Sequence, residues 1–227
     1  MAQKAPKAKP IVIGFCGDSS VGKTALYTRL GKGIFSTTVP TISSDTIVNK
    51  ITVEGQVHTV QFIDTAGQES FRSQTLSYIR NVQTILFCFD ISSKNSFNSI
   101  QYWVDTYEQN HINRKIPVRM LLGCKSDLAK NRQVSLEEAK ALADKNELTY
   151  LECSAKTEDG LKDFVKNLVM KFKAQNPTLV NFGVDAKATS ELSQKTQEDA
   201  ILNITKQPAQ TPTGAGQAQN AAESQCC

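Results

Sequence analysis

Long apolar runs are missing from this chain of 227 residues, and their absence argues against a protein with membrane-spanning helices. No apolar stretch approaches the roughly 18 residues that cross a bilayer as a helix, so the sequence predicts no membrane span. The first ten residues, MAQKAPKAKP, contain three lysines but no apolar core. That composition argues against a secretory signal and predicts a disordered arm over residues 1–9.

Histidines are also few, and the cysteines are not spaced as metal ligands are. Only two histidines occur, and the six cysteines form no CxxC motif or Cys/His cluster, so we expect no zinc site. Four of the cysteines lie in or beside strand-like runs, which is typical of small buried side chains in a reducing cytosol. The net charge of +4 comes without a basic stripe interleaved with aromatic residues, so we expect no nucleic-acid partner.

What the chain does contain is an alternation of β-branched apolar runs with helical patterns. The predicted strands are 11–17, 46–54, 57–64, 83–90, 118–124 and 148–153, and the predicted helices are 22–31, 70–80, 95–109, 135–145 and 160–173. A hairpin-type turn, Glu54-Gly55-Gln56, separates the second and third strands. The order predicts an α/β fold: a six-stranded, mostly parallel sheet with one antiparallel strand and about five helices on both faces.

The same pattern predicts one domain over residues 10–174, followed by a flexible tail over 175–227. The tail is rich in Gln, Ala, Pro and Thr and cannot bury enough apolar surface to offset the entropy of ordering it. Inside the domain, Ser135-Leu136-Glu137-Glu138 reads as a capping box at a helix start. A stripe at helical spacing reads as core: Phe97, Ile100, Val104 and Tyr107, with Trp103 beside them.

The string GDSSVGKT, Gly17–Thr24, has the form GxxxxGK[ST] and lies between a predicted strand and a predicted helix. In this context the backbone N–H groups of the loop and the helix N-terminus hold phosphates. Lys23 adds a positive charge for the β- and γ-phosphates, and the Thr24 hydroxyl suits Mg²⁺. The predicted nucleotide-binding residues of this loop are Gly17, Asp18, Ser19, Ser20, Val21, Gly22, Lys23, Thr24 and Ala25.

The string DTAGQE, Asp64–Glu69, begins where the third strand is predicted to end. Ligands of α/β folds bind at the carboxyl ends of parallel strands, which puts Asp64 beside the metal, with a water molecule between them. Gly67 would let the backbone approach the γ-phosphate, and Gln68 would orient the attacking water, so Gln68 and Lys23 are the predicted catalytic residues. Both strings together predict a nucleotide triphosphatase with a conformational switch.

Two further strings complete a family pattern. Cys124-Lys125-Ser126-Asp127 resembles the guanine-recognition motif NKxD, and Glu152-Cys153-Ser154-Ala155-Lys156 resembles the motif ExSAK that closes over the base. With the phosphate loop and DTAGQE, they make the chain similar to small GTPases of the Ras superfamily, most of all the Rab family. The resemblance covers about residues 11–173 and the C-terminus, and it implies a P-loop G domain that binds GTP and GDP with Mg²⁺.

The resemblance also implies roles for single residues. Asp127 would accept hydrogen bonds from guanine N1 and the exocyclic amine, Lys125 would lie along the base, and the Ala155 N–H would donate to O6. Ser154 and Lys156 would belong to the loop that closes over the base. Thr41, in Val39-Pro40-Thr41-Ile42, matches the switch threonine that binds Mg²⁺ in the triphosphate state. The implied metal residues are Thr24, Thr41 and Asp64.

Features typical of Rab proteins include Phe71-Arg72, Ser77-Tyr78-Ile79-Arg80 and the final Cys226-Cys227. In that family the cysteine pair implies two geranylgeranyl lipids, which together anchor a protein stably where one lipid is marginal. The implied protein is a cytoplasmic switch on an endomembrane in vesicle traffic, served by an exchange factor, an activating protein, effectors and a prenyl chaperone. The alternative is a lipidated, GTP-bound scaffold that hydrolyses little; a nucleotide kinase is less supported, because no arginine-rich lid is visible.

The chain departs from the family at several positions. Cys124 replaces the asparagine of NKxD, and a thiol is a weak donor and acceptor. Ile63 stands where Rab proteins usually have tryptophan, and Ile42-Ser43-Ser44-Asp45-Thr46 replaces IGVDF, so partners of relatives do not transfer to this chain. The aromatic that covers the base normally lies seven residues before the switch threonine. Here Phe35 lies six residues before Thr41, so either Phe35 or Ile34 takes this role.

Overall fold

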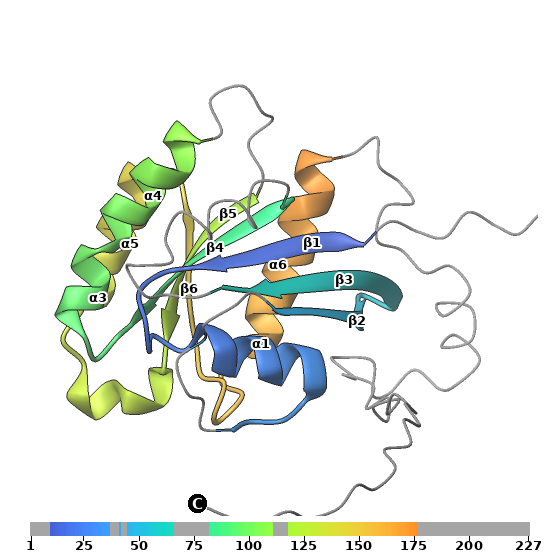
Figure 1. Ribbon diagram of the computed structural model, residues 1–227, viewed down its shortest axis with the longest axis horizontal. Helices are drawn as coiled ribbons and strands as arrows, with labels where there is room; N and C mark the ends of the chain where they lie inside the picture. Colours follow the sequence, from blue (N-terminus) through green and yellow to red (C-terminus); the bar gives the residue numbers. More distant parts are fainter. Residues whose placement is uncertain (1–9, 37–40, 42–44, 66–81, 111–117, 177–227) are drawn as a thin grey trace, which may run out of the picture.

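The computed structural model describes residues 10–36, 41, 45–65, 82–110 and 118–176. Its six strands form one sheet in the order β2-β3-β1-β4-β5-β6 (Figure 1). Only β2 runs antiparallel to its neighbour, so the predicted six-stranded, mostly parallel sheet is confirmed. The strands are β1 (Ile11–Cys16), β2 (Asp45–Val53), β3 (Gln56–Asp64), β4 (Thr84–Asp90), β5 (Val118–Cys124) and β6 (Thr149–Cys153).

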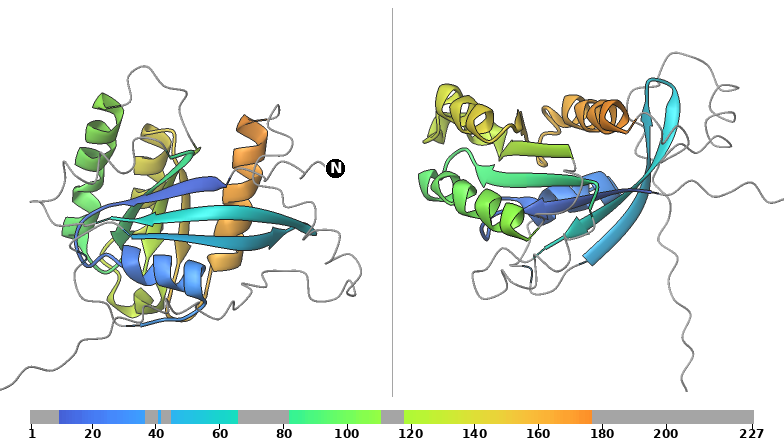
Figure 2. Two further views of the ribbon diagram at one scale, coloured as in Figure 1. Left: turned by 45° about the vertical axis from the view of Figure 1, so that its right-hand side comes forward. Right: turned by 90° about the horizontal axis from the view of Figure 1, so that it is seen from above.

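Helices cover both faces of the sheet, as the alternating pattern predicts. One core lies between the sheet and helices α1 and α6, and a second lies between the sheet and helices α3, α4 and α5. The latter three gather on the left in Figure 1, and Figure 2 shows the sheet between the two layers. The helices are α1 (Lys23–Lys32), α3 (Lys94–Asn98), α4 (Ile100–Gln109), α5 (Leu136–Lys145) and α6 (Leu161–Gln175), with a 3₁₀ helix, η2 (Ser126–Asn131).

Three predicted boundaries differ from the structure or lie beyond it. The single helix expected over 95–109 is wrong, because α3 and α4 are separate helices that meet at Ser99. The Ser99 hydroxyl donates to the Asn95 carbonyl oxygen at 3.1 Å, a backbone-directed bond that bends helices. Helix α6 continues to Gln175, the first residue of the predicted tail. The helix expected over 70–80 lies outside the described residues.

The β2–β3 hairpin is tighter than expected. Val53 pairs with Gln56, so the turn contains only Glu54 and Gly55, and Gln56 already belongs to β3. Both turn residues have positive φ, 49° and 73°. This two-residue turn matches the twist of the strands it joins.

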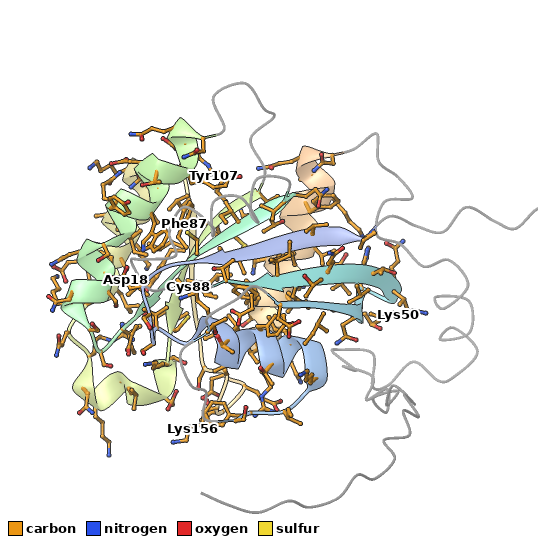
Figure 3. The ribbon with its side chains drawn as sticks, in the orientation of Figure 1. Asp18, Lys50, Phe87, Cys88, Tyr107 and Lys156 are labelled. Atoms are coloured by element: carbon orange, nitrogen blue, oxygen red, sulfur yellow. The ribbon has the colours of Figure 1, made fainter. Side chains whose placement is uncertain are left out.

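The two local helix predictions are confirmed. The stripe residues Phe97, Ile100, Trp103, Val104 and Tyr107 are all buried, and the Tyr107 ring meets the Phe87 ring edge-on at 5.9 Å between centroids (Figure 3). At the start of α5, Ser135 and Glu138 exchange side chain-to-backbone hydrogen bonds of 3.1 Å, which is a capping box.

The sheet directs five strand ends to one edge of the molecule. Because β1, β3, β4, β5 and β6 are mutually parallel, their carboxyl ends lie side by side. The loops that follow the strand ends carry nearly all of the sequence motifs.

In the described ranges, no helix combines the length and the apolar character needed to cross a membrane.

Two glycines with nearly the same φ angle show how the packing around a residue adds to the cost of placing a Cβ there. Gly55 has φ 73° and open space around an added Cβ, whereas Gly160 has φ 71° and would place a Cβ 2.2 Å from the Glu152 carbonyl oxygen. Because a left-handed residue costs about 1–2 kcal/mol when it carries a Cβ, Gly55→Ala should lower the free energy of unfolding by about 1 kcal/mol. Gly160→Ala should lower it by about 3 kcal/mol, because the clash adds to the strain. Urea titrations followed by circular dichroism measure both, and equal losses would contradict the assigned clash.

A second test concerns His58 on β3. Its side chain is fully buried, and neither ring nitrogen has a hydrogen-bond partner in the described part of the chain. Burial, with a smaller contribution from Lys173, lowers its pKa to about 4. The unfolded chain binds this proton near pH 6.5, so the neutral imidazole favours the folded state above that pH and ceases to do so as the pH falls toward 4. Between pH 6.5 and 4.5 the unfolding free energy should therefore fall by about 1.4 kcal/mol per pH unit from this group. His58→Leu should flatten that slope in urea titrations, and an unchanged slope would show that other groups cause it.

Candidate functional site

A cavity of about 270 Å³ opens at the carboxyl edge of the sheet. Five segments line it: the phosphate loop with the start of α1, the segment after α1, and the ends of β3, β5 and β6. The lining residues are Ser19, Ser20, Gly22, Lys23, Thr24, Ala25, Leu26, Phe35, Ser36, Thr41, Thr65, Cys124, Lys125, Asp127, Cys153, Ser154, Ala155 and Lys156.

Most of the predicted site residues therefore meet around one cavity. Gly17, Asp18, Val21 and Asp64 are exceptions, because they lie beside the cavity without lining it. Gly67 and Gln68, like the proposed lipid-bearing Cys226 and Cys227, lie outside the described residues, so their roles remain predictions.

Lys23 is the buried charge at the bottom of the phosphate loop. Its side chain is only 4% exposed, and its ammonium donates to the carbonyl oxygens of Gly17 at 2.9 Å and Asp18 at 2.6 Å. Burial lowers the pKa of Lys23, while the nearby Asp64 carboxylate is among the groups that oppose this shift. A phosphate oxygen entering the cavity would offer this ammonium a charged acceptor in place of neutral carbonyls.

The loop around Lys23 is pressed against the sheet and held from outside. A Cβ at Gly17 would come within 2.2 Å of the Cys88 carbonyl oxygen, so only glycine fits there. The Asp18 carboxylate points away from the cavity and accepts a 2.8 Å hydrogen bond from the indole N–H of Trp103 on α4. Figure 3 places Asp18 and Cys88 together near the end of β1. Trp103, expected only as core, thus also fixes the phosphate loop.

Three oxygen-bearing side chains meet beside Lys23. The hydroxyl oxygens of Thr24 and Thr41 lie 2.6 Å apart, and the Thr41 hydroxyl donates to Asp64 Oδ2 at 3.3 Å. Asp64 is buried, and its Oδ1 atom has no hydrogen-bond partner among the residues that the structure describes. Burial raises the pKa of its carboxyl, while hydrogen bonds from Thr24 and Thr41 oppose the shift. An all-oxygen set with an unsatisfied buried carboxylate oxygen fits a hard cation such as Mg²⁺.

This all-oxygen ligand set differs from the sets of cysteine thiolates and histidine imidazoles that bind softer metals. Across the described ranges, no group of three or more His, Cys, Asp or Glu side chains could hold a metal ion. Two of the three oxygens in the set come from threonine hydroxyls, which lie 17 positions apart in sequence.

At the opposite end of the cavity, the end of β5 is tied to the phosphate loop. The Lys125 backbone is left-handed, with φ 62°, and its ammonium donates to the Ser20 carbonyl oxygen at 2.7 Å. The same ammonium pairs with Asp90 Oδ2 at 2.7 Å. Cys124, just before it, is buried in the cavity wall with its sulfur 3.8 Å from the Leu122 carbonyl oxygen.

The ends of β5 and β6 are linked through Ser154. Its hydroxyl donates to Asp127 Oδ1 at 2.6 Å and accepts from the backbone N–H groups of Lys156 and Thr157, both at 3.1 Å. This arrangement holds one oxygen of the Asp127 carboxylate and fixes the turn that contains Ala155. The two strings that resemble guanine-recognition motifs therefore form one hydrogen-bonded unit.

The structure also distinguishes the two candidates for covering the base. Phe35 lines the cavity, whereas Ile34 is 52% exposed and does not line it. The lining residues that the sequence did not single out as binding residues are Leu26, Ser36, Thr65 and Cys153. Two of these residues, Thr65 and Cys153, lie inside motifs already identified in the sequence, and this location could have marked them as lining residues. The Thr65 hydroxyl donates to the Phe15 carbonyl oxygen at 2.8 Å.

Comparisons with known proteins agree with this geometry. The model of the Ras family matches residues 10–174. The Ras-related protein Rab-18 of Lymnaea stagnalis is 36% identical over 184 residues, which cover 77% of this chain and 90% of that protein. The Ras-related protein Rab-30 of Homo sapiens is 36% identical over 168 residues, which cover 73% and 82%.

A third relative carries its ligand in its name. The GTP-binding protein ypt2 of Schizosaccharomyces pombe is 36% identical over 160 residues, which cover 70% of this chain and 79% of that protein. The fold, the lined cavity and the extent of these matches agree with one another. The chain belongs to the Ras family as a Rab-type small GTPase, an enzyme that hydrolyses GTP.

Proposed function

We propose that this GTPase is a slow, Mg²⁺-dependent switch in vesicle traffic, held on the cytosolic face of an endomembrane by lipids on Cys226 and Cys227. The observation that carries the proposal is the contact between Thr24, Thr41 and Asp64 beside the buried Lys23. It joins the phosphate loop to the segment after α1, which is the connection that a terminal phosphate and its metal would control.

The chemistry follows from the residues around that contact. Thr24 and Thr41 would hold Mg²⁺ with Asp64 behind them, and the ion would neutralise charge on the phosphates. The Lys23 ammonium would move from loop carbonyls to the β- and γ-phosphate oxygens. Gln68 would orient a water molecule that attacks the γ-phosphorus in line, while the bond from that phosphorus to the GDP oxygen breaks.

The rate should be low without help. No arginine occurs among the described residues that line the cavity, and we propose that an activating protein supplies the guanidinium that stabilises charge on the transferred phosphoryl group. Intrinsic turnover on the order of 10⁻⁴ s⁻¹, as for Ras, is the expectation until an activating protein supplies one. Loss of the γ-phosphate would then release Thr41 and Gly67, which changes the surface that effectors read.

The Rab-type role implies protein partners and a location on a membrane. An exchange factor, an activating protein, effectors and a prenyl chaperone would act on the domain over residues 10–174. The hypervariable tail, which follows helix α6, would connect the domain to the lipids on Cys226 and Cys227. Because two lipid chains anchor a protein stably without a basic patch, the tail's lack of basic clusters is compatible with this role.

The second candidate is a lipidated scaffold that stays bound to GTP and hydrolyses little. Cys124, in the place of the family's asparagine, and the changed residues Ile42–Thr46 favour it. Gln68 favours the switch, since a scaffold has no need of a residue that positions water.

Gln68→Leu distinguishes the two candidates. Without the side-chain amide that orients water, single-turnover phosphate release with a cognate activating protein should fall at least 100-fold. Gln56→Leu, at the distant β2–β3 hairpin, is the control and should leave the rate unchanged. A wild-type rate that does not depend on Gln68, even with activator, would support the scaffold.

Cys124→Asn tests the departure from the recognition motif. The asparagine amide can hydrogen-bond the base or the phosphate loop, which the thiol does only weakly, and one net hydrogen bond contributes roughly 1 kcal/mol. The dissociation rate of a fluorescent GDP should therefore fall about fivefold in this variant. Cys124→Val, which has a similar shape and no donor, should not slow release. An off-rate that is the same for asparagine and valine would show that position 124 does not contribute through hydrogen bonding.

A further inference from the structure

Arg29 is a nearly buried cation that does not line the cavity. It lies on α1, the helix that begins in the phosphate loop, and its side chain is only 12% exposed. A charge removed from water in this way needs several hydrogen-bond partners. The partners of Arg29 show what its position accomplishes.

The guanidinium spans from α1 to the loop between β6 and α6. Its Nε donates to the Ala155 carbonyl oxygen at 2.8 Å, and its Nη2 lies 3.4 Å from the Lys156 carbonyl oxygen. Its Nη1 donates to the Gly33 carbonyl oxygen at 3.0 Å and to Glu158 Oε1 at 2.7 Å. One side chain thus connects the helix of the phosphate loop with the loop proposed to read the base.

The peptide group between Ala155 and Lys156 is held at both of its polar atoms. Arg29 binds the carbonyl oxygen on the Ala155 side, and the Ser154 hydroxyl accepts from the N–H on the Lys156 side. The same Ser154 hydroxyl donates to Asp127. A continuous set of hydrogen bonds therefore runs from α1 through this peptide group to the carboxylate proposed to recognise guanine.

The neighbouring N–H of Ala155 is left available. Ala155 lines the cavity, and within the part of the chain that the structure describes, its N–H donates to no protein acceptor. Its direction depends on the adjoining peptide group, which Arg29 holds. Moving that peptide group would move the Ala155 N–H with it.

We propose that Arg29 is a specificity-determining positioning residue for the guanine base. It acts through the Ala155–Lys156 peptide group and keeps the Ala155 N–H aimed at the O6 oxygen, without touching the nucleotide itself. The inference rests on the proposed function of the cavity as a guanine site. It assigns to an arginine outside the motifs a share in choosing the base.

The carbonyl contacts, rather than the ion pair, carry this effect. The Glu158 side chain is 63% exposed, and exposed ion pairs contribute little because water screens them. The guanidinium offers donors in several fixed directions, which suits carbonyl oxygens of Ala155 and Gly33 that lie on different sides. A lysine ammonium at this position is a single point charge and cannot serve both geometries equally well.

The experiment compares three diphosphates on the full-length protein. GDP carries O6 and the amine, and inosine diphosphate keeps O6 but lacks the amine. The diphosphate of 2-aminopurine riboside keeps the amine but lacks O6 and the N1–H, so each ligand is compared with itself across the variants. Equilibrium dissociation constants are measured for the wild type, Arg29→Met and Arg29→Lys. Glu158→Gln is the matched control, because it removes the ion pair and leaves the carbonyl contacts.

Arg29→Met should weaken GDP and inosine diphosphate alike, by about tenfold, and 2-aminopurine riboside diphosphate by less than threefold. Arg29→Lys should fall between Met and wild type, and Glu158→Gln should stay within twofold of wild type for all three ligands. Equal weakening of all three ligands in both Arg29 variants would overturn the inference, because a general loosening of the fold acts on phosphates as well. Unchanged GDP affinity in Arg29→Met would overturn it too. A wild type that binds all three diphosphates and ADP equally would instead refute the guanine site itself.

Discussion

The buried ammonium of Lys23 is the charge around which the site is arranged. It is desolvated beneath the phosphate loop and bonded only to the carbonyls of Gly17 and Asp18 among the loop's groups. The loop can hold this shape because glycine at position 17 lets it lie on β4, and because Trp103 holds Asp18 from the far side. The set of Thr24, Thr41 and Asp64, which we propose holds Mg²⁺, lies beside this charge, and hydrogen bonds between the three side chains keep their oxygens together.

Two cationic side chains connect the part of the cavity formed by the phosphate loop and α1 with the part formed by the ends of β5 and β6. Lys125 joins the end of β5 to the Ser20 carbonyl, and Arg29 joins α1 to the turn at Ala155. Both side chains use a cation to hold backbone carbonyls of a distant segment, an interaction stronger than a neutral hydrogen bond. The two parts of the cavity therefore share one set of contacts, and changes within such a set are not additive in free energy.

The spacing of apolar residues predicted most helices and strands correctly, but it did not predict which side chains form hydrogen bonds with one another. The stripe from Phe97 to Tyr107 is core, as its spacing predicts, but the same spacing predicts a single helix where Ser99 separates two. A helical repeat reports which face of a helix is apolar, and it carries no information about a hydroxyl that bonds back to Asn95. For the same reason Trp103 reads as a buried ring, and its indole N–H to Asp18 is invisible before the chain folds.

The amino-acid strings by themselves establish a phosphate loop, a parallel α/β sheet and a family, because each depends on residue types at short, fixed spacing. Glycines and a lysine within eight positions suffice for the loop, and alternating apolar runs suffice for the sheet. Only the folded chain decides that Arg29, Ser154 and Asp127 share one set of hydrogen bonds, or that Phe35 rather than Ile34 faces the cavity. Those relations join residues as many as 126 positions apart, and the direction of each side chain depends on packing that no local pattern encodes.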